Sequence, residues 1–128
     1  MRQSVRSGSP YEATIGFSRA VRVGDVIHVS GTAPVWPDGH CDPDPEVQAD
    51  RCFEIIAGAL AGLGATLDDV VRTRMYITDP AVADAVGRAH ARAVGRVGPA
   101  ATMVVVAGLL DPRWVVEIEA DAVCGRQA

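Results

Sequence analysis

Two neighbouring segments decide the fold: Gly98-Pro99-Ala100-Ala101-Thr102-Met103-Val104-Val105-Val106-Ala107 and, after a turn, Trp114-Val115-Val116-Glu117-Ile118-Glu119-Ala120-Asp121-Ala122-Val123. The first segment is apolar on both faces, which is typical of a strand buried on both sides. The second alternates, with acidic residues on one face and aliphatic residues on the other. We expect the two strands to form a hairpin that closes the fold. The acidic row is the first candidate for a functional site.

Composition narrows the classes of function. The chain has 128 residues, of which 48% are hydrophobic and 22% charged, which predicts one globular domain over residues 1–128. The formal net charge is −4, so we expect no nucleic-acid partner and no attraction to an anionic membrane. No apolar run approaches the roughly 18 residues of a membrane span, and we expect a cytoplasmic protein. The three cysteines are far apart and the histidines do not cluster, which predicts reduced thiols and no metal site.

The rest of the chain predicts short strands and two helices. Residues 1–16 are rich in Ser, Gly and Arg and are expected to form an arm without regular structure. A strand is expected over Val70–Thr78, with Val71, Thr73, Met75 and Ile77 on one face and Arg72, Arg74, Tyr76 and Thr78 on the other. The remaining expected elements are a hairpin of residues 20–23 and 26–30 around Gly24-Asp25, a helix over residues 46–63 that Gly64 ends, and a helix from Asp79-Pro80 to about Gly95.

Two amphipathic helices can cover one face of a sheet built from these strands, but not both faces. The sequence therefore predicts an α+β fold with a mixed sheet and two helices packed on one face. The uncovered face would expose part of the apolar segment 101–107. We expect further copies of the chain to bury it, which predicts a homo-oligomer.

Several local strings, in this order along the chain, resemble the RidA family (reactive intermediate deaminase A, also called the YjgF or endoribonuclease L-PSP-like family). The resemblance spans roughly residues 15 to 123 and implies a chorismate-mutase-like fold and a homotrimer with clefts between subunits. In the deaminating branch, these clefts hydrolyse small enamines and imines without a metal or organic cofactor. The strings are Phe17-Ser18-Arg19-Ala20-Val21-Arg22-Val23-Gly24-Asp25, Val29-Ser30-Gly31, Leu67-Asp68-Asp69-Val70-Val71, Tyr76-Ile77-Thr78-Asp79, Pro99-Ala100 and Val116-Glu117-Ile118-Glu119-Ala120.

The resemblance also assigns residues, and here the match is partial. The acid that positions the hydrolytic water falls on Glu117, and the backbone part of the site falls on Ser30-Gly31. Phe17 stands where the family has a pocket tyrosine, and a pocket asparagine falls near Gly87. The arginine that binds the substrate carboxylate falls on Ala101, and its neighbouring cysteine falls on Met103. A methyl group cannot replace a bidentate arginine contact, so the chain resembles an arginine-less branch of the family.

Alternatives remain open at each candidate site residue. Glu117 either acts on a ligand or forms a salt bridge between subunits. Arg74 shares the face of Glu117 by strand parity, so it either supplies the missing positive charge or neutralises the acidic row. Glu12, in the arm, is a candidate to fold over the cleft together with Tyr11.

Three functions follow for such a small-molecule site. The first is a trimer that binds a carbonyl- or imine-type metabolite in its interfacial clefts, with Glu117 positioning water for hydrolysis. The second is a deaminase with a relocated arginine, and the third is a non-catalytic ligand-binding or regulatory trimer. A ribonuclease is disfavoured because the chain has no basic surface interleaved with aromatic residues.

Overall fold

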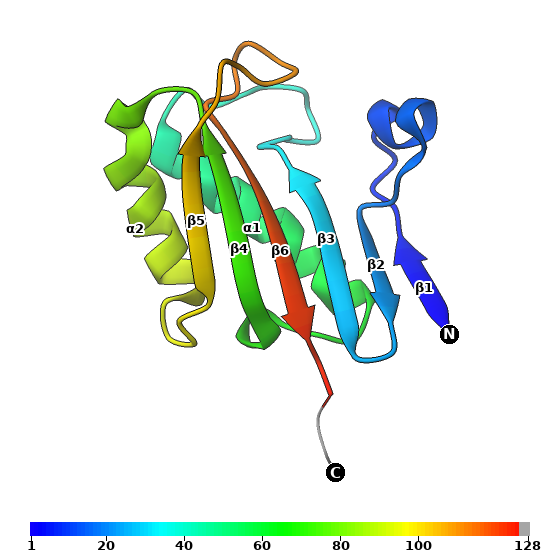
Figure 1. The fold of residues 1–128 in the computed structure, drawn as a ribbon. Helices are drawn as coiled ribbons and strands as arrows, with labels where there is room; N and C mark the ends of the chain where they lie inside the picture. Colours follow the sequence, from blue (N-terminus) through cyan, green and yellow to red (C-terminus); the bar gives the residue numbers. More distant parts are fainter. Residues whose placement is uncertain (126–128) are drawn as a thin grey trace.

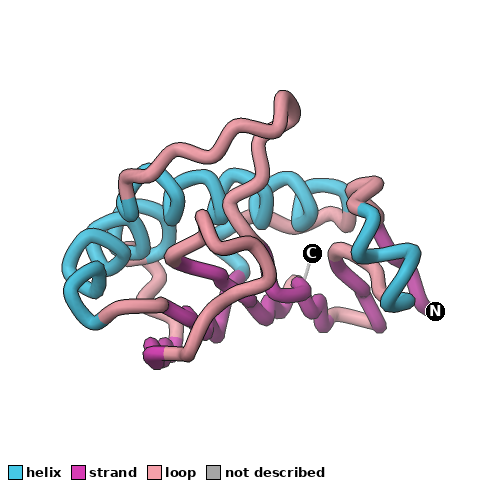
Figure 2. The backbone as a smooth tube through the Cα atoms, turned by 90° about the horizontal axis from the view of Figure 1, so that it is seen from above, coloured by secondary structure: helices cyan, strands magenta, loops and turns pink. Residues whose placement is uncertain are grey.

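The computed structural model describes residues 1–125, which form one six-stranded sheet with two helices on one of its faces. The helices are α1 (Pro45–Gly62) and α2 (Ala83–Val94), and both lie on the same side of the strand layer (Figures 1 and 2). This confirms the predicted α+β architecture. The strands, in their order across the sheet, are β1 (Arg2–Val5), β2 (Ala20–Val23), β3 (Val26–Thr32), β6 (Val116–Val123), β4 (Val70–Ile77) and β5 (Ala100–Val105).

The local signals for the hairpin and the first helix are confirmed. Strands β2 and β3 pair antiparallel around Gly24, whose φ of 59° is a left-handed conformation that glycine adopts readily. Helix α1 begins after Asp44, whose side chain accepts a hydrogen bond from the N–H of Glu46 at 2.8 Å. Gly64, with a φ of 83°, follows the end of α1. The helix-facing core consists mainly of Ile27, Val29, Cys52, Phe53, Ile56, Leu60, Met75, Ile77, Val86, Val116, Ile118 and Ala120.

The expected terminal hairpin is wrong. Strand β5 pairs in parallel with β4 at the edge of the sheet, whereas β6 lies between β3 and β4 and is antiparallel to both. The physical reason is that α2 connects β4 to β5, and a helical crossover returns the chain parallel to the strand it left. The next segment, residues 106–115, then passes β4 and brings β6 in on its other side (Figure 1).

Two smaller expectations are also corrected. Residues 1–16 are not an irregular arm, because β1 pairs with β2 and a short π-helix, η1 (Glu12–Gly16), precedes β2. Strand β1 satisfies the backbone groups that the outer edge of β2 would otherwise leave unpaired. In β4, the pairing register shifts between Val70 and Arg72, so Val70 is buried and Val71 is 47% exposed. Val71 therefore does not share the core face of Met75. Two single turns of 3-10 helix complete the fold, η2 (Leu67–Asp69) and η3 (Pro80–Val82).

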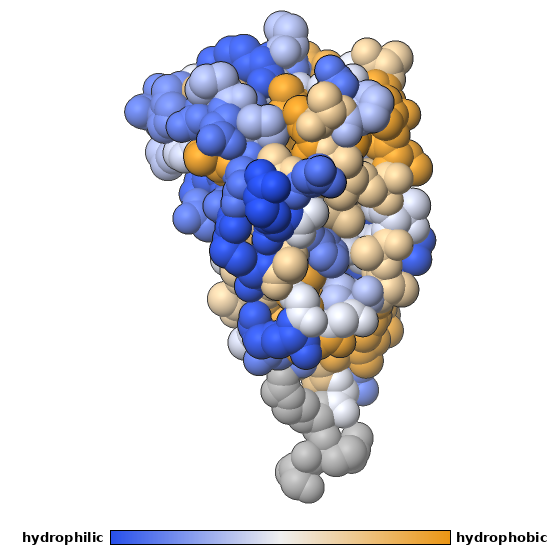
Figure 3. Space-filling model, turned by 90° about the vertical axis from the view of Figure 1, so that its left-hand side faces the viewer, coloured by the Kyte–Doolittle hydropathy of each residue, from blue (hydrophilic) through white to orange (hydrophobic). Residues whose placement is uncertain are grey.

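The face of the sheet that the helices leave uncovered is polar at its centre, whereas its edge at β5 exposes valine side chains. At the centre this face is polar, with Arg74, Tyr76 and Glu119 side by side on β4 and β6. At the edge, Val104 and Val105 of β5 are 42% and 54% exposed. Figure 3 views the molecule from this edge and shows hydrophobic residues gathered along one side and hydrophilic residues along the other. Strand β5 therefore contributes exposed apolar surface at this edge of the sheet.

A buried side chain of α1 fixes the two segments beside the start of β6. The side-chain amide of Gln48 donates to the carbonyls of Asp42 at 2.8 Å and of Arg113 at 2.9 Å. Its carbonyl accepts from the N–H of Val115 at 2.9 Å. These bonds set the position of the chain two residues before Glu117. Within residues 1–125, neither helix has the length and apolar character needed to cross a membrane.

Candidate functional site

At the candidate site, the side chain of Glu117 in β6 lies close to the backbone of Gly31 in β3. The register of the two strands shifts between Val29 and Thr32, so β3 bulges at this point. A Cβ atom added to Gly31 would lie far inside van der Waals contact with Oε2 of Glu117. The carboxylate therefore occupies the space that a side chain would take at position 31. The structure thus brings together Glu117 and Gly31, which the resemblance had assigned to one site.

Arg19 is the residue that the sequence analysis missed. It directly precedes β2, and its Nη2 donates to the carbonyl of Gly31. The guanidinium carbon lies 5.6 Å from the centre of the Phe17 ring, within the range of a cation–π contact. Arg19 was visible within the string Phe17–Asp25, where alternation with the apolar Ala20 predicts that it points away from the core. Only the bulge of β3 reveals that it reaches the same glycine as Glu117.

Burial is the main cause of the pKa shifts of Glu117 and Arg19. Burial raises the pKa of Glu117, the attraction of Arg19 opposes that rise, and repulsion from Glu119 adds to it. Burial lowers the pKa of Arg19, and the attraction of Glu12 and Glu117 opposes that change. A carboxylate with a raised pKa is poised to accept a proton or to orient water. The arrangement can therefore act on a small ligand that has both an anionic and an electrophilic group.

The other candidates from the N-terminal part lie around this centre. The Ser30 hydroxyl donates to the carbonyl of Ser18 at 2.7 Å, so it ties β3 to the segment before Arg19. Glu12 is only 2% exposed, and its carboxylate accepts from the N–H of Ser7 at 3.0 Å and from the Ser7 hydroxyl. Glu12 thus fixes the fold of the N-terminal segment, and it also attracts Arg19.

Arg74 lies on the same face of the sheet as Glu117, as strand parity predicts, but its ion pairs are with the next two acids. Its Nη1 is 3.2 Å from Asp121 and 3.8 Å from Glu119. The Tyr76 hydroxyl also donates to Glu119, which raises the tyrosine's pKa. Within residues 1–125, the positive charge of Arg74 is therefore shared with the acidic row.

The β5 candidates lie on the opposite face. Met103 is aligned with Met75, which faces the helices, and it packs against the edge of the core. Ala101 is aligned with the buried Thr73 and is itself exposed. In a single chain, neither residue therefore shares the sheet face of Glu117.

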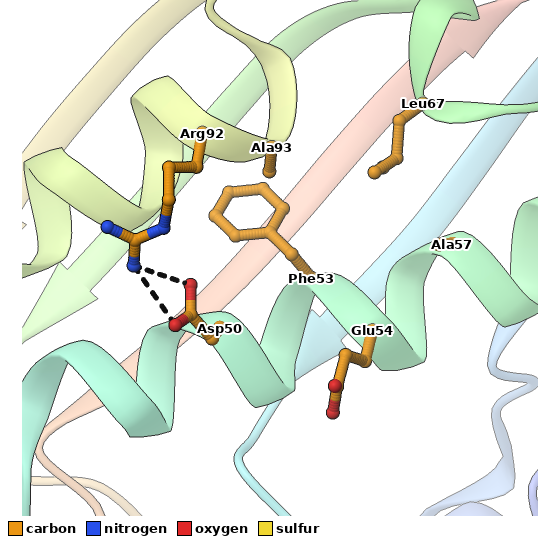
Figure 4. Close-up of a pocket in the computed structure, with 7 residues that line it drawn as sticks. All are labelled: Asp50, Phe53, Glu54, Ala57, Leu67, Arg92 and Ala93. Atoms are coloured by element: carbon orange, nitrogen blue, oxygen red, sulfur yellow. Dashed lines mark hydrogen bonds and ion pairs between the residues drawn. The ribbon is translucent and has the colours of Figure 1, made fainter.

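A shallow hollow of the surface lies away from these residues. A shallow groove of about 410 Å³ runs between α1 and α2, with Phe53 at its floor and the ion pair of Arg92 with Asp50 at its rim (Figure 4). Its lining comes from the helices and from Leu67, and it contains none of the candidate site residues. Among residues 1–125, no three His, Cys, Asp or Glu side chains are grouped so as to hold a metal ion.

Comparison with known proteins identifies the family. The sequence matches the endoribonuclease L-PSP family over residues 8–124. An uncharacterised protein of Streptomyces coelicolor is 38% identical over 122 residues, which are 94% of this chain and 91% of that protein. Rv2704 of Mycobacterium tuberculosis, a member of the YjgF/YER057c/UK114 family, is 43% identical with a TM-score of 0.89 over 96% of this chain and 99% of that structure.

A solved structure that carries the name RidA also has the same fold as this chain. RidA from the Antarctic bacterium Psychrobacter is 26% identical, with a TM-score of 0.81 over 94% of both chains. The sheet order, the two helices on one face and the match over residues 8–124 thus lead to one conclusion. The chain belongs to the endoribonuclease L-PSP family, which is also known as the YjgF or RidA family.

Proposed function

We propose that this protein binds a small carbonyl- or imine-type metabolite beside Glu117, in clefts formed between three copies of the chain in the cytoplasm. In this proposal Glu117 positions a water molecule for hydrolysis of the ligand. The observation that supports the proposal most strongly is the contact between the Glu117 carboxylate and Gly31. A carboxylate packed against bare backbone, with a pKa raised by burial, is costly unless the protein uses it.

The chemistry requires one base and a polarising environment. Water adds to the carbon of the C=N bond while Glu117 takes a proton from that water. The proton then passes to the nitrogen and gives a carbinolamine. Transfer of the hydroxyl proton to the amine lets the C–N bond break, and ammonia leaves as the C=O bond forms. Backbone N–H groups near Gly31 would stabilise the charge that develops during addition. No other reactant is needed, because one imine and one water molecule give one ketone and one ammonia molecule.

A ribonuclease activity is not proposed, although "putative endoribonuclease" describes the relative from Thermotoga maritima, which is 29% identical. The acidic row of Glu117, Glu119 and Asp121 would repel the phosphates of RNA. Its only ion-pairing arginine, among the described residues, is Arg74. A non-catalytic ligand-binding trimer is the second candidate, since Ala101 stands where the resemblance places the arginine that holds the substrate.

The test compares binding with turnover. The imine of pyruvate, generated in solution from alanine by an amino-acid oxidase, serves as substrate, and pyruvate serves as the binding probe. Glu117→Gln keeps the shape of the side chain but removes its basicity, so we expect pyruvate affinity within a few fold of wild type and imine hydrolysis reduced by about 100-fold or more. Glu119→Gln is the matched control on the same strand and should retain activity.

The possible results separate the candidates. Turnover that survives Glu117→Gln would contradict the assigned role of Glu117. Pyruvate binding without any hydrolysis by the wild-type protein would support the non-catalytic trimer. Absence of both binding and turnover in the wild type would contradict the proposed function as a whole.

A further inference from the structure

We propose that Arg19 binds the anionic group of the ligand, so that the site prefers a small ligand with a carboxylate next to its electrophilic carbon over an uncharged analogue. This inference rests on the proposed function and names the residue that determines specificity at the same site. It follows from the position of the guanidinium, from its incomplete hydrogen bonding and from the engagement of the neighbouring arginines.

The first argument is position. Arg19 and Glu117 contact the same residue, Gly31, the first through the glycine carbonyl and the second through the space beside its α-carbon. Each residue attracts the other electrostatically. Within residues 1–125, however, their charged groups do not come within the 4.0 Å of an ion pair, so neither neutralises the other directly. A ligand with an anionic end and an electrophilic carbon next to it fits between such groups.

The second argument is the incomplete hydrogen bonding of Arg19. A guanidinium carries five N–H donors in a planar fork. In the part of the chain that the structure describes, one hydrogen bond is formed, from Nη2 to Gly31, and the buried Nε has no acceptor. Glu12 is nearby, but its carboxylate accepts hydrogen bonds from the N–H and the hydroxyl of Ser7. An unsatisfied buried donor is costly, and a ligand carboxylate is the acceptor that an arginine fork binds best.

The third argument is that the arginines on the neighbouring strands are already engaged. Arg74 pairs with Asp121 and Glu119, and Arg72 donates to the Thr102 hydroxyl at 2.7 Å. Arg22 donates to the carbonyl of Leu63 at 2.7 Å. The aromatic ring of Phe17 beside Arg19 restricts the plane of its guanidinium, which lowers the entropy lost when an anion binds. Among the arginines of residues 1–125, Arg19 is therefore the one that combines an unsatisfied buried donor with an electrostatic attraction to Glu117.

The test uses two probes of nearly equal shape, pyruvate and its uncharged analogue pyruvamide, with affinities measured by calorimetry. Wild type should bind pyruvate at least about tenfold more tightly, as expected for one charge-assisted contact. Arg19→Gln should remove this preference. Arg19→Lys should keep part of it, because a point charge cannot reproduce the fork. Arg74→Gln is the matched control and should leave the preference unchanged.

A preference for pyruvate that persists in Arg19→Gln, or that is lost in Arg74→Gln, would overturn the inference and leave the proposed function standing. If wild type binds neither probe, the proposed function fails first, which is a different result. A second measurement needs no variant: the ¹⁵Nε resonance of Arg19 in the wild-type protein should shift with pyruvate and not with pyruvamide. An unchanged resonance at saturating pyruvate would also overturn the inference, even if the variants were to misfold.

Discussion

Glu117 is destabilising as an ionised group in the folded chain. Its carboxylate lies against Gly31, where burial deprives it of water, and Arg19 compensates only in part. The raised pKa is a statement about stability, because the unfolded chain ionises this glutamate near its ordinary value of about 4.3. As the pH rises from that value through the folded pKa, the folded state loses stability relative to the unfolded state. The loss is complete once both states are ionised.

Glu117→Gln should therefore stabilise the protein at neutral pH. The variant cannot ionise, so it avoids the penalty that wild type carries above the folded pKa of Glu117. Its melting temperature should exceed that of wild type at pH 7. The difference should vanish below about pH 4, where Glu117 of wild type is protonated in both the folded and the unfolded chain. Differential scanning calorimetry over this pH range measures the effect.

The control for this experiment is Glu54→Gln, which removes one negative charge from the exposed outer face of α1. It should not reproduce the pH-dependent gain. A melting temperature of Glu117→Gln equal to or below that of wild type at pH 7 would contradict the environment described for Glu117.

At the scale of single residues, the sequence predicted part of the arrangement at the candidate site. The resemblance assigned Glu117 and Gly31 to one site, and the structure brings them into contact. Parity alone placed Arg74 on the face of Glu117, but parity has no information about distance along a strand. The ion pairs of Arg74 with Asp121 and Glu119 depend on the register of β4 with β6. Arg19 was missed because it reaches Gly31 only through a bulge that no local pattern specifies.

At the scale of elements, the position of Glu117 depends on Gln48 of α1. The hydrogen bonds of this buried amide with backbone groups hold Asp42, Arg113 and Val115, and so fix the chain where it enters β6. Without the amide, the N–H of Val115 would lose its acceptor, and the carbonyls of Asp42 and Arg113 would keep only weak contacts with the Cys41 thiol. Because β6 begins directly after Val115, any displacement there is passed on to Glu117.

Gln48→Leu should therefore lower both stability and ligand binding. A buried backbone group that loses its partner costs about 1–3 kcal/mol, so a loss of at least about 2 kcal/mol in the free energy of unfolding is expected. Chemical denaturation measures the loss, and pyruvate binding measures the displacement of the site. Gln3→Leu, on the exposed strand β1, is the matched control and should change the free energy of unfolding by less than about 0.5 kcal/mol. Equal effects of the two substitutions would contradict the role of Gln48.

The elements themselves were predicted better than their order. Periodicity located the two helices and every strand except β1 because burial on one face has a local signature. Strand order has no such signature, so β5 and β6 were expected to pair when they are in fact separated by β4. The N-terminal strand β1 was missed because its residues are mostly exposed and do not alternate. It forms because β2 offers an unpaired edge.

At the scale of the whole molecule, the edge strand β5 is a surface that a single chain does not cover. It exposes Val104 and Val105 and one row of unpaired backbone groups, which is unfavourable in an isolated domain. This surface supports the proposed trimer. Light scattering on the purified protein should then give a mass of three chains, and a stable monomer at micromolar concentration would contradict the trimer.

Val105→Asp should dissociate or aggregate the protein, because the contact between copies would then bury an unpaired charge. Size-exclusion chromatography with light scattering distinguishes these outcomes from an intact trimer. Val47→Asp is the matched control, since Val47 is a 38%-exposed valine on α1, on the helix side of the molecule. An intact trimer for Val105→Asp, or dissociation by the control, would show that β5 is not at the interface.

The measurement that tests the central claim most directly is a crystal structure of the wild-type protein with pyruvate. The account predicts pyruvate beside Gly31, with its carboxylate on the guanidinium of Arg19 and its keto carbon facing the carboxylate of Glu117. Pyruvate bound to Arg74, pyruvate in the groove between α1 and α2, or a site filled by side chains of a neighbouring copy would contradict it.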